Sequence, residues 1–237
     1  MEEFEVLSNG FRIAQCSGLF RLGTDSMLLA DVCTPLRGHT VADLGCGSGA
    51  LGVLLCAYAP ACRVTGIELQ EAACKLAKRN IAINSLDDRF CLVPGDLRNI
   101  RALLPANGFD CVVSNPPYFP IGSGLPAAEE AFAIARTECC CTLDDLCEAA
   151  SWLLRYGGSI FVVHRPERMA ELMYAMKLHR LEPKRLRLVR HHLGAPVSHI
   201  LLEGRLGGKP GLQIEQELFL FTPSGEPTPE YRRIYHM

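Results

Sequence analysis

The stretch Thr40–Glu68 constrains the fold of this chain more than any other part of the sequence. It begins with an apolar run typical of a buried strand and enters a turn with a glycine at every second position, Gly45-Cys46-Gly47-Ser48-Gly49. A nearly all-apolar helix, Ala50–Ala59, is expected next, and a second apolar strand, Cys62–Ile67, ends at Glu68. Two strands joined by a helix form a βαβ unit, so this stretch predicts an α/β fold.

The same alternation of strand and helix continues along the chain. An amphipathic helix, Glu71–Asn84, precedes a third strand, Arg89–Val93, and a short helix, Arg98–Leu104, precedes a fourth strand, Phe109–Val113. Such crossovers are right-handed and place helices on both faces of a sheet. The sequence therefore predicts a doubly wound, mostly parallel sheet.

The second half of the chain is less regular. A helix is expected over Leu143–Arg155, a fifth strand over Ser159–Val163 and another helix over Pro166–Leu178. Ile200–Glu203 and Leu218–Phe221 are expected to be the last strands, both antiparallel.

The first residues predict a hairpin followed by a capped helix. Phe4–Gln15 alternates around the tip Ser8-Asn9-Gly10, and Asn-Gly is the favoured two-residue hairpin turn. Thr24 or Asp25 can cap an apolar helix, Met27–Cys33. The loop before that helix could also cover a ligand, a role that capping does not exclude.

Polar side chains follow the first four predicted parallel strands at the point where each strand ends. They are Asp43, Glu68, Asp96 and Asn115. Because ligands of open α/β sheets bind at the carboxyl ends of the strands, we expect these residues to converge on one crevice. An acidic residue after the second strand commonly binds ribose hydroxyls, and one after the third can accept from an adenine amino group. For Asp96 the alternative is that it simply caps the next short helix.

The glycine-rich turn is compatible with two kinds of cofactor. Gly47–Gly52 matches the G-x-G-x-x-G pattern of dinucleotide-binding domains, but a single match of this kind is weak. Asp43 would repel a pyrophosphate and attract a cationic amino group. This favours S-adenosylmethionine, which carries an amino group, a sulfonium and no phosphate.

The segment Ser114–Tyr118 leaves the fourth strand as a stiff loop. Pro116 and Pro117 lack backbone donors and have a fixed φ, and Asn115 is held extended because a proline follows it. Taken alone, the segment could be a strand end with a solvated Asn and a half-buried Tyr. Its place beside the other strand ends favours a binding site.

Composition limits the partners and the compartment. The formal net charge of −2 gives no overall positive field, so a nucleic-acid partner would have to meet a local patch. The acidic start, Met-Glu-Glu, does not resemble a leader peptide, no apolar run approaches the ~20 residues of a membrane span, and the 12 cysteines are expected as reduced thiols in the cytoplasm. The cluster Cys139-Cys140-Cys141 with Cys147 lacks the spacing of a metal site, so no metal is predicted.

A strand with one charged face is expected over Lys184–His192. Its cations are Lys184, Arg185, Arg187 and Arg190. Such a face is usually only solvated, but in a slightly acidic chain it is also the best candidate for contact with a nucleic-acid backbone.

Four motifs occur in series: Asp43-Leu44-Gly45-Cys46-Gly47-Ser48-Gly49, Glu68, Asp96-Leu97 and Asn115-Pro116-Pro117-Tyr118. This series resembles that of class I S-adenosylmethionine-dependent methyltransferases acting on an exocyclic or amide nitrogen. Three further segments resemble the bacterial tRNA(Val) adenine-N6 methyltransferases, which modify the adenosine next to the anticodon: Phe20–Ala30, Ala135–Glu138 and Leu201–Arg205.

The resemblance implies one domain over residues 1–237 and tRNA as the partner. A seven-stranded, Rossmann-like methyltransferase sheet is implied over residues 37–237, with a hairpin and helix appended over residues 1–36.

The resemblance also implies which residues bind S-adenosylmethionine: Thr24, Asp25, Asp43, Gly45, Cys46, Gly47, Gly49, Glu68, Leu69, Asp96, Leu97 and Asn115. The glycine-rich turn would line the methionine end of the cofactor, and Asp43 would support the turn. Thr24 and Asp25 would close over the same end. Glu68 would take the ribose hydroxyls, Leu69 would pack on the adenine, and Asp96 would accept from its amino group.

The implied catalytic residues are Asn115, Pro116, Pro117 and Tyr118. An aryl amine is a poor nucleophile because its lone pair is delocalised into the ring. If the Asn115 oxygen and the Pro116 carbonyl accept its two hydrogens, the lone pair can point at the methyl group, a gain from positioning and preorganised acceptors. Tyr118 would stack on the target base.

Other members of this class of enzyme remain alternatives. A protein glutamine methyltransferase shares the Asn-Pro-Pro-Tyr motif, although it usually has an extra N-terminal helical domain that this sequence does not predict. A guanine-specific rRNA methyltransferase and a DNA adenine-N6 methyltransferase are also possible. Outside methyl transfer, the alternative is a silent module that only binds S-adenosylmethionine.

Overall fold

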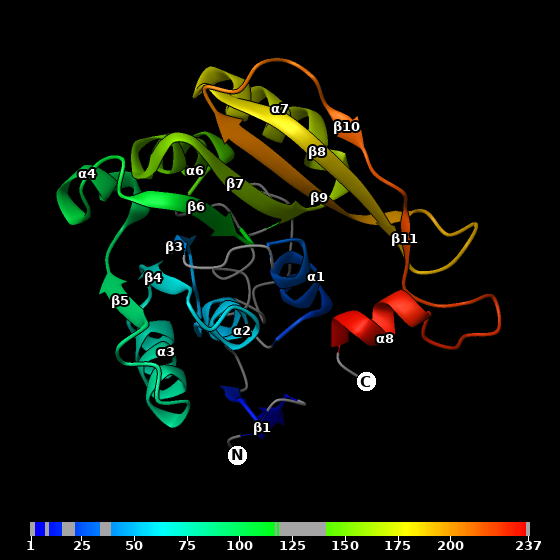
Figure 1. Ribbon diagram of the computed structural model, residues 1–237, viewed down its shortest axis with the longest axis horizontal. Helices are drawn as coiled ribbons and strands as arrows, with labels where there is room; N and C mark the ends of the chain where they lie inside the picture. The colour runs from blue at the N-terminus through cyan, green and yellow to red at the C-terminus, as the bar shows by residue number, and fades with distance from the viewer. Residues whose placement is uncertain are drawn as a thin grey trace, which may run out of the picture.

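The computed structural model describes residues 3–7, 10–15, 22–33, 39–116, 118 and 141–235. Its centre is a sheet with the strand order β10-β8-β9-β7-β6-β3-β4-β5, and β11 also pairs with β8 (Figure 1). The strands are β3 (Thr40–Leu44), β4 (Arg63–Glu68), β5 (Phe90–Pro94), β6 (Phe109–Ser114), β7 (Leu154–His164), β8 (Leu181–Arg190), β9 (Val197–Leu206), β10 (Gln213–Ile214) and β11 (Leu218–Phe219). The pairs among β3, β4, β5, β6 and β7 are parallel, and β9 is antiparallel to β7 and β8. The predicted doubly wound, mostly parallel sheet is confirmed.

Two details of the predicted sheet change. The described residues form nine strands in this sheet rather than seven, because the two-residue strands β10 and β11 follow the outer edge of β8. The strand at Leu218 is parallel to β8, where it lies opposite Val189, and not antiparallel as expected. The chain leaves β9 beside Leu181, at the start of β8, and then follows β8 in the same direction.

Each face of the sheet has its own core, because successive strand residues point to opposite faces. One core packs α1 (Thr24–Cys33), α2 (Ala50–Tyr58) and α8 (Pro229–Tyr235) against the sheet, and the other packs α6 (Leu143–Leu153) and α7 (Met169–Leu178), as Figure 1 shows. The other helices in the described ranges are α3 (Glu71–Ile83), α4 (Ile100–Leu103) and the 3-10 turns η1 (Leu97–Asn99) and η4 (Pro166–Arg168). None of the helices in the described part of the chain is long and apolar enough to cross a membrane.

The predicted N-terminal hairpin is present and is tied to the glycine-rich turn. Its strands are β1 (Glu3–Val6) and β2 (Arg12–Gln15). The wholly buried side chain of Asn80 accepts from the backbone N–H of Ala14 (2.7 Å) and donates to the carbonyl of Ser48 (2.9 Å). One amide on α3 therefore joins the hairpin to the turn, a contact that the sequence did not indicate.

Candidate active site

The glycine-rich turn lies at the carboxyl edge of the sheet and is fixed to the neighbouring strand β4. The backbone N–H groups of Gly45 and Cys46 both donate to the carbonyl of Ile67, at 2.9 and 3.0 Å. The φ angles of Gly45, Gly47 and Gly49 are 72°, 55° and 74°, a region that other residues disfavour. Glycine is therefore needed for the shape of the turn. A Cβ added at Gly45 would meet nothing within 4 Å, whereas one added at Gly49 would press on Ala77 and Phe90 at 3.3–3.4 Å.

A cavity next to this turn brings distant parts of the chain together. Its lining residues in the described part of the chain are Ser26, Asp43, Gly45, Cys46, Gly47, Ser48, Ala50, Leu51 and Asn115. They come from α1, the end of β3, the turn, the start of α2 and the end of β6. The convergence expected from the strand ends is observed for Asp43, the turn and Asn115.

Asp43 is a buried carboxyl group with unused hydrogen-bonding capacity. Its side chain is 1% exposed, and its Oδ2 has no hydrogen-bond partner. Burial raises the pKa of Asp43 to about 8; the nearby charge of Glu68 adds to this, and the backbone N–H of Gly52 opposes it. The free protein therefore holds a group here that a cationic partner would stabilise in its ionised form.

Glu68 braces the loops around the site. One carboxylate oxygen accepts from the backbone N–H of Gly47 (2.8 Å) and the other from that of Gln70 (2.7 Å). Each oxygen keeps a further lone pair that could accept from a ribose hydroxyl. The predicted contact of Glu68 with ribose stays a prediction. The next residue, Leu69, is 47% exposed, so an apolar surface is available where the adenine was expected to pack.

Asp96 caps the 3-10 turn η1, as the simpler alternative predicted. Its Oδ1 accepts from the backbone N–H of Arg98 (2.9 Å), and its carboxylate pairs with the Arg98 guanidinium. Hydrogen bonding from the Arg98 side chain lowers the pKa of Asp96. Leu97 packs against the core below. Contact of either residue with a cofactor stays a prediction.

The residues expected to be catalytic form a hydrogen-bonded group with the start of α1. The hydroxyl of Tyr118 bonds to Oδ2 of Asp25 and to Oδ1 of Asn115, the latter at 2.7 Å. Nδ2 of Asn115 donates to the hydroxyl of Ser26 (3.3 Å). Pro116 is half-buried, and Pro117 lies outside the described residues.

Three side chains that the sequence did not single out surround the ring of Tyr118. The rings of His164 and His199 meet it edge-on, with centroids 5.4 and 6.1 Å away, and the guanidinium of Arg165 lies 5.4 Å from its centroid. His164 is wholly buried with no partner for Nε2, and burial lowers its pKa to about 4, so it is neutral at pH 7. Because His164 ends β7, applying the strand-end rule to the fifth strand would have found it.

Thr24 and Asp25 both bond within the protein. Thr24 accepts from the hydroxyl of Tyr235 (3.0 Å) in the C-terminal helix α8, and Asp25 accepts from Tyr118. Closure of these residues over a cofactor stays a prediction.

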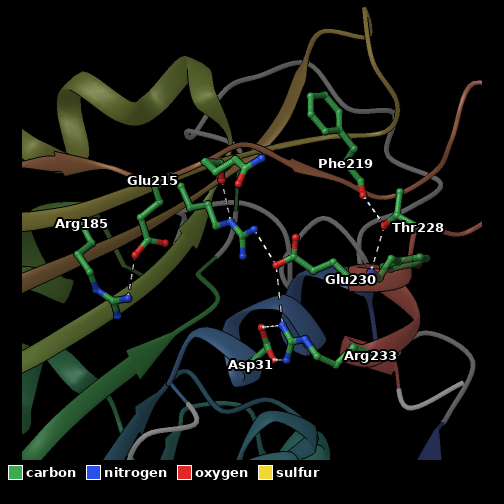
Figure 2. Close-up of polar contacts among 10 residues, drawn as sticks. Asp31, Arg185, Glu215, Phe219, Thr228, Glu230 and Arg233 are labelled. Carbon is green, nitrogen blue, oxygen red and sulfur yellow. Dashed lines mark hydrogen bonds and ion pairs between the residues drawn. The ribbon is translucent and has the colours of Figure 1, made fainter.

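The cations of β8 lie in a network of glutamates and carbonyls, of which Figure 2 shows the pair of Arg185 with Glu215. The pairs are Arg185 with Glu203 and Glu215, Arg187 with Glu230 and Arg190 with Glu217; Lys184 donates to the carbonyls of Lys209 and Gly211. Binding of nucleic acid by this face stays a prediction, and these pairs reduce the positive charge that it presents.

The cysteine cluster is only partly described. Cys139 and Cys140 lie outside the described residues, Cys141 is half-exposed, and Cys147 is buried. Within the described ranges, no group of three or more His, Cys, Asp or Glu side chains is arranged to hold a metal ion.

The fold and the cavity at its carboxyl edge define a methyltransferase domain. The sequence model of the family described as "Methyltransferase small domain" matches residues 17–182. A predicted O-methyltransferase from Agrobacterium tumefaciens has a similar solved structure, with a TM-score of 0.75 and 23% identity, covering 90% of this chain and 96% of that chain. P. horikoshii TYW2, solved in complex with MeSAdo, has a TM-score of 0.61 at 16% identity over 87% of this chain and 72% of that one.

A curated relative places the chain more narrowly. The tRNA1(Val) (adenine(37)-N6)-methyltransferase of Porphyromonas gingivalis is 30% identical over 236 residues, which cover 94% of this chain and 90% of the relative. The chain belongs to the family of tRNA1(Val) (adenine(37)-N6)-methyltransferases, and the family predicted from the motifs is confirmed.

Proposed function

We propose that this enzyme transfers a methyl group from S-adenosylmethionine to the exocyclic amino group of an adenine in the anticodon loop of a tRNA. The observation that carries the proposal is the position of the Asn115 amide, which shares one cavity with the glycine-rich turn. Family membership supports the choice of tRNA and of adenine, because the relatives are named for that substrate. The cysteines of the described ranges are free thiols, and we infer that the enzyme works in the cytoplasm.

The residues around the cavity fit S-adenosylmethionine. The unpartnered oxygen of Asp43 suits a cationic amino group, and at Gly45 even an added Cβ would meet nothing within 4 Å. The turn and Asp43 would hold the methionine end, Glu68 the ribose, and Leu69 and Asp96 the adenine. When bound, the cofactor supplies an electrophilic methyl group on a positively charged sulfur.

The chain itself contributes acceptors and position. The side-chain oxygen of Asn115 and the carbonyl of Pro116 would accept the two amino hydrogens of the target adenine and draw its nitrogen away from planarity. No strong base is needed before transfer, because the methylated nitrogen is acidic and loses its proton afterwards. An adenine in an anticodon loop is already accessible, so little energy is spent on flipping it from a helix.

Transfer of labelled methyl tests this proposal. Purified enzyme and labelled S-adenosylmethionine are incubated with tRNA, rRNA, DNA and protein from cells that lack the enzyme, and each pool is digested to nucleosides or amino acids. N6-methyladenosine in tRNA is the expected product, and Asn115→Ala should not form it.

Label in another pool would change the substrate and keep the chemistry. Methylglutamine in protein, methylguanosine in rRNA or N6-methyladenine in DNA would replace the proposed substrate. Cofactor binding with no label in any pool would favour a silent binding module.

A further inference from the structure

The hydroxyl of Tyr118 has more acceptors than protons. Oδ2 of Asp25 and Oδ1 of Asn115 both lie within hydrogen-bonding distance of it, at positions 93 and 3 residues away in the chain. A phenol carries a single proton, so it can donate to only one of them at a time. The other acceptor must find another donor or turn away.

Asp25 is the stronger of the two acceptors. It lies in the first turn of α1, where the helix dipole stabilises a carboxylate, and its Oδ1 also accepts from the backbone N–H of Ser26 (3.3 Å). A hydrogen bond to a carboxylate is stronger than one to a neutral amide. Burial, together with the charge of Asp25, raises the pKa of Tyr118, so the phenol keeps its proton.

The acceptor to which the Tyr118 hydroxyl donates determines which end of the Asn115 amide faces Tyr118. If the phenol donates its hydrogen bond to Asp25, its oxygen still has a lone pair that can accept. The NH2 group of Asn115 is then the end of the amide that can bond to the phenol. The amide oxygen then faces Ser26, whose hydroxyl can donate to it and which lines the same cavity as Asn115. The structure draws the amide the other way round, with Oδ1 toward Tyr118 and Nδ2 toward Ser26. The two ends of an amide have the same shape and differ only in their hydrogen bonds. With the NH2 group on the Ser26 side, it would meet the amino hydrogens of the target base.

We propose that Asp25 is a positioning residue that, through the hydroxyl of Tyr118, turns the oxygen of the Asn115 amide toward the cavity. The phenol donates its hydrogen bond to Asp25 and accepts one from the amide nitrogen, so the amide oxygen is left to accept from substrate. This inference rests on the proposed function, because it gives Asn115 the role of an acceptor.

The surroundings of the Tyr118 ring keep the phenol in place for this role. His164 and His199 meet the ring edge-on, and Arg165 lies over it while donating to the carbonyl of Ser198 (3.0 Å). The ring is thus held by β7 and β9 while its hydroxyl reaches α1. A hydroxyl held in this way can discriminate between two orientations of an amide.

The first test is a double-mutant cycle of Asp25→Ala and Tyr118→Phe, measured as kcat for tRNA methylation and as the dissociation constant of S-adenosylmethionine. Asp25→Ala alone should lower kcat at least about tenfold, because the phenol then donates to Asn115, and cofactor affinity should stay the same. Asp25→Asn, which keeps an acceptor, should recover part of the loss. In the Tyr118→Phe background Asp25→Ala should have no further effect, because there is no phenol proton to redirect.

The second test does not depend on activity. With ¹³C at the Cζ of tyrosine and ¹⁵N in asparagine, Asp25→Ala should shift the Tyr118 and Asn115 side-chain resonances. Asp31→Ala is the matched control, because Asp31 is another acid of α1 but pairs with Arg233. It should leave both resonances in place.

Two results would overturn the inference. If Asp25→Ala lowers cofactor affinity equally in the wild-type and Tyr118→Phe backgrounds, Asp25 is a cofactor ligand. If the Tyr118 and Asn115 resonances do not shift, Asp25 does not control the hydrogen bond of the phenol. A wild-type enzyme that methylates no tRNA would overturn the proposed function instead, and the resonances would still decide the role of Asp25.

Discussion

The carboxyl edge of the sheet and the strand β8 differ in whether their polar side chains have partners within the protein. At the edge, Asp43 and His164 are buried with atoms that have no hydrogen-bond partner. On β8, the side chains of Arg185, Arg187 and Arg190 each pair with at least one glutamate. An unpartnered buried polar atom costs free energy, whereas a paired charge is largely neutralised.

The difference shows where unused capacity lies. The run of cations on β8 is the more conspicuous feature of the sequence, but its charges are committed to other parts of the chain. At the carboxyl edge, Oδ2 of Asp43 and Nε2 of His164 have no partner within the protein. Substitutions at the carboxyl edge should therefore change activity, and substitutions on β8 should change stability.

The first prediction contrasts two amides. Asn115→Ala should lower the rate of methyl transfer about 10²–10³-fold, because a preorganised hydrogen-bonding group at the reacting atoms is lost. Its effect on cofactor affinity and melting temperature should be small. Asn84→Ala is the control, because Asn84 bonds to the backbone of Arg12 in the hairpin (2.8 Å) and should affect stability but not rate. Equal losses of activity in the two variants would contradict a special role for Asn115.

The second prediction concerns protons at Asp43. Because its pKa is about 8 in the free protein, the group is mostly protonated at pH 7. A cationic amino group beside it would favour the ionised form, so binding of S-adenosylmethionine should release close to one proton. The affinity should rise with pH by up to about tenfold per unit until about pH 8.

Calorimetry in two buffers with different ionisation enthalpies measures this proton release, and Asp43→Asn should abolish it. The stability of the free protein supplies an independent check. Its carboxyl keeps a proton that the unfolded chain releases near the ordinary value of 3.8, so this group's stabilisation is lost as pH rises toward 8. Asp43→Asn should flatten that fall, and proton uptake on cofactor binding would refute the assignment.

The third prediction tests the paired region. Arg185→Ala leaves the buried Glu203 without its closest guanidinium, so the free energy of unfolding should drop by about 1–3 kcal/mol. Urea titration measures the loss. The salt dependence of tRNA binding tests the other role: if these arginines also contact RNA, each removal should flatten the slope by about one. An unchanged slope would leave them a structural role only.

The smallest effect is expected at the edge of the same network. Arg233 forms a two-pronged ion pair with Asp31 on α1, at 2.6 and 2.9 Å (Figure 2). The side chain of Arg233 is 59% exposed. Arg233→Ala should therefore cost only about 0.2–1 kcal/mol, and less at high salt. If Arg233→Ala lowers the free energy of unfolding as much as Arg185→Ala does, the exposure of a side chain does not determine how much its ion pair stabilises the protein.

Much of the site could be predicted from the sequence because it follows from local pattern. Strands and their ends are visible as apolar runs, and the ends of parallel strands meet at one edge whatever the details of packing. Asp43, the glycine-rich turn and Asn115 follow this rule and line one cavity. The capping role of Asp96 could also be predicted as an alternative, because capping depends only on neighbours in the chain.

The strand–helix order, the edge at which the polar strand ends gather and the Pro-Pro segment after Asn115 all follow from local patterns in the sequence. Which distant residues meet is visible only in the folded chain: Asp25 contacts Tyr118 across 93 residues, and Arg233 contacts Asp31 across 202. Local patterns depend on the period of the backbone, whereas such contacts depend on how every intervening element packs. For the same reason the sequence showed the charges of β8 but not the glutamates that neutralise them.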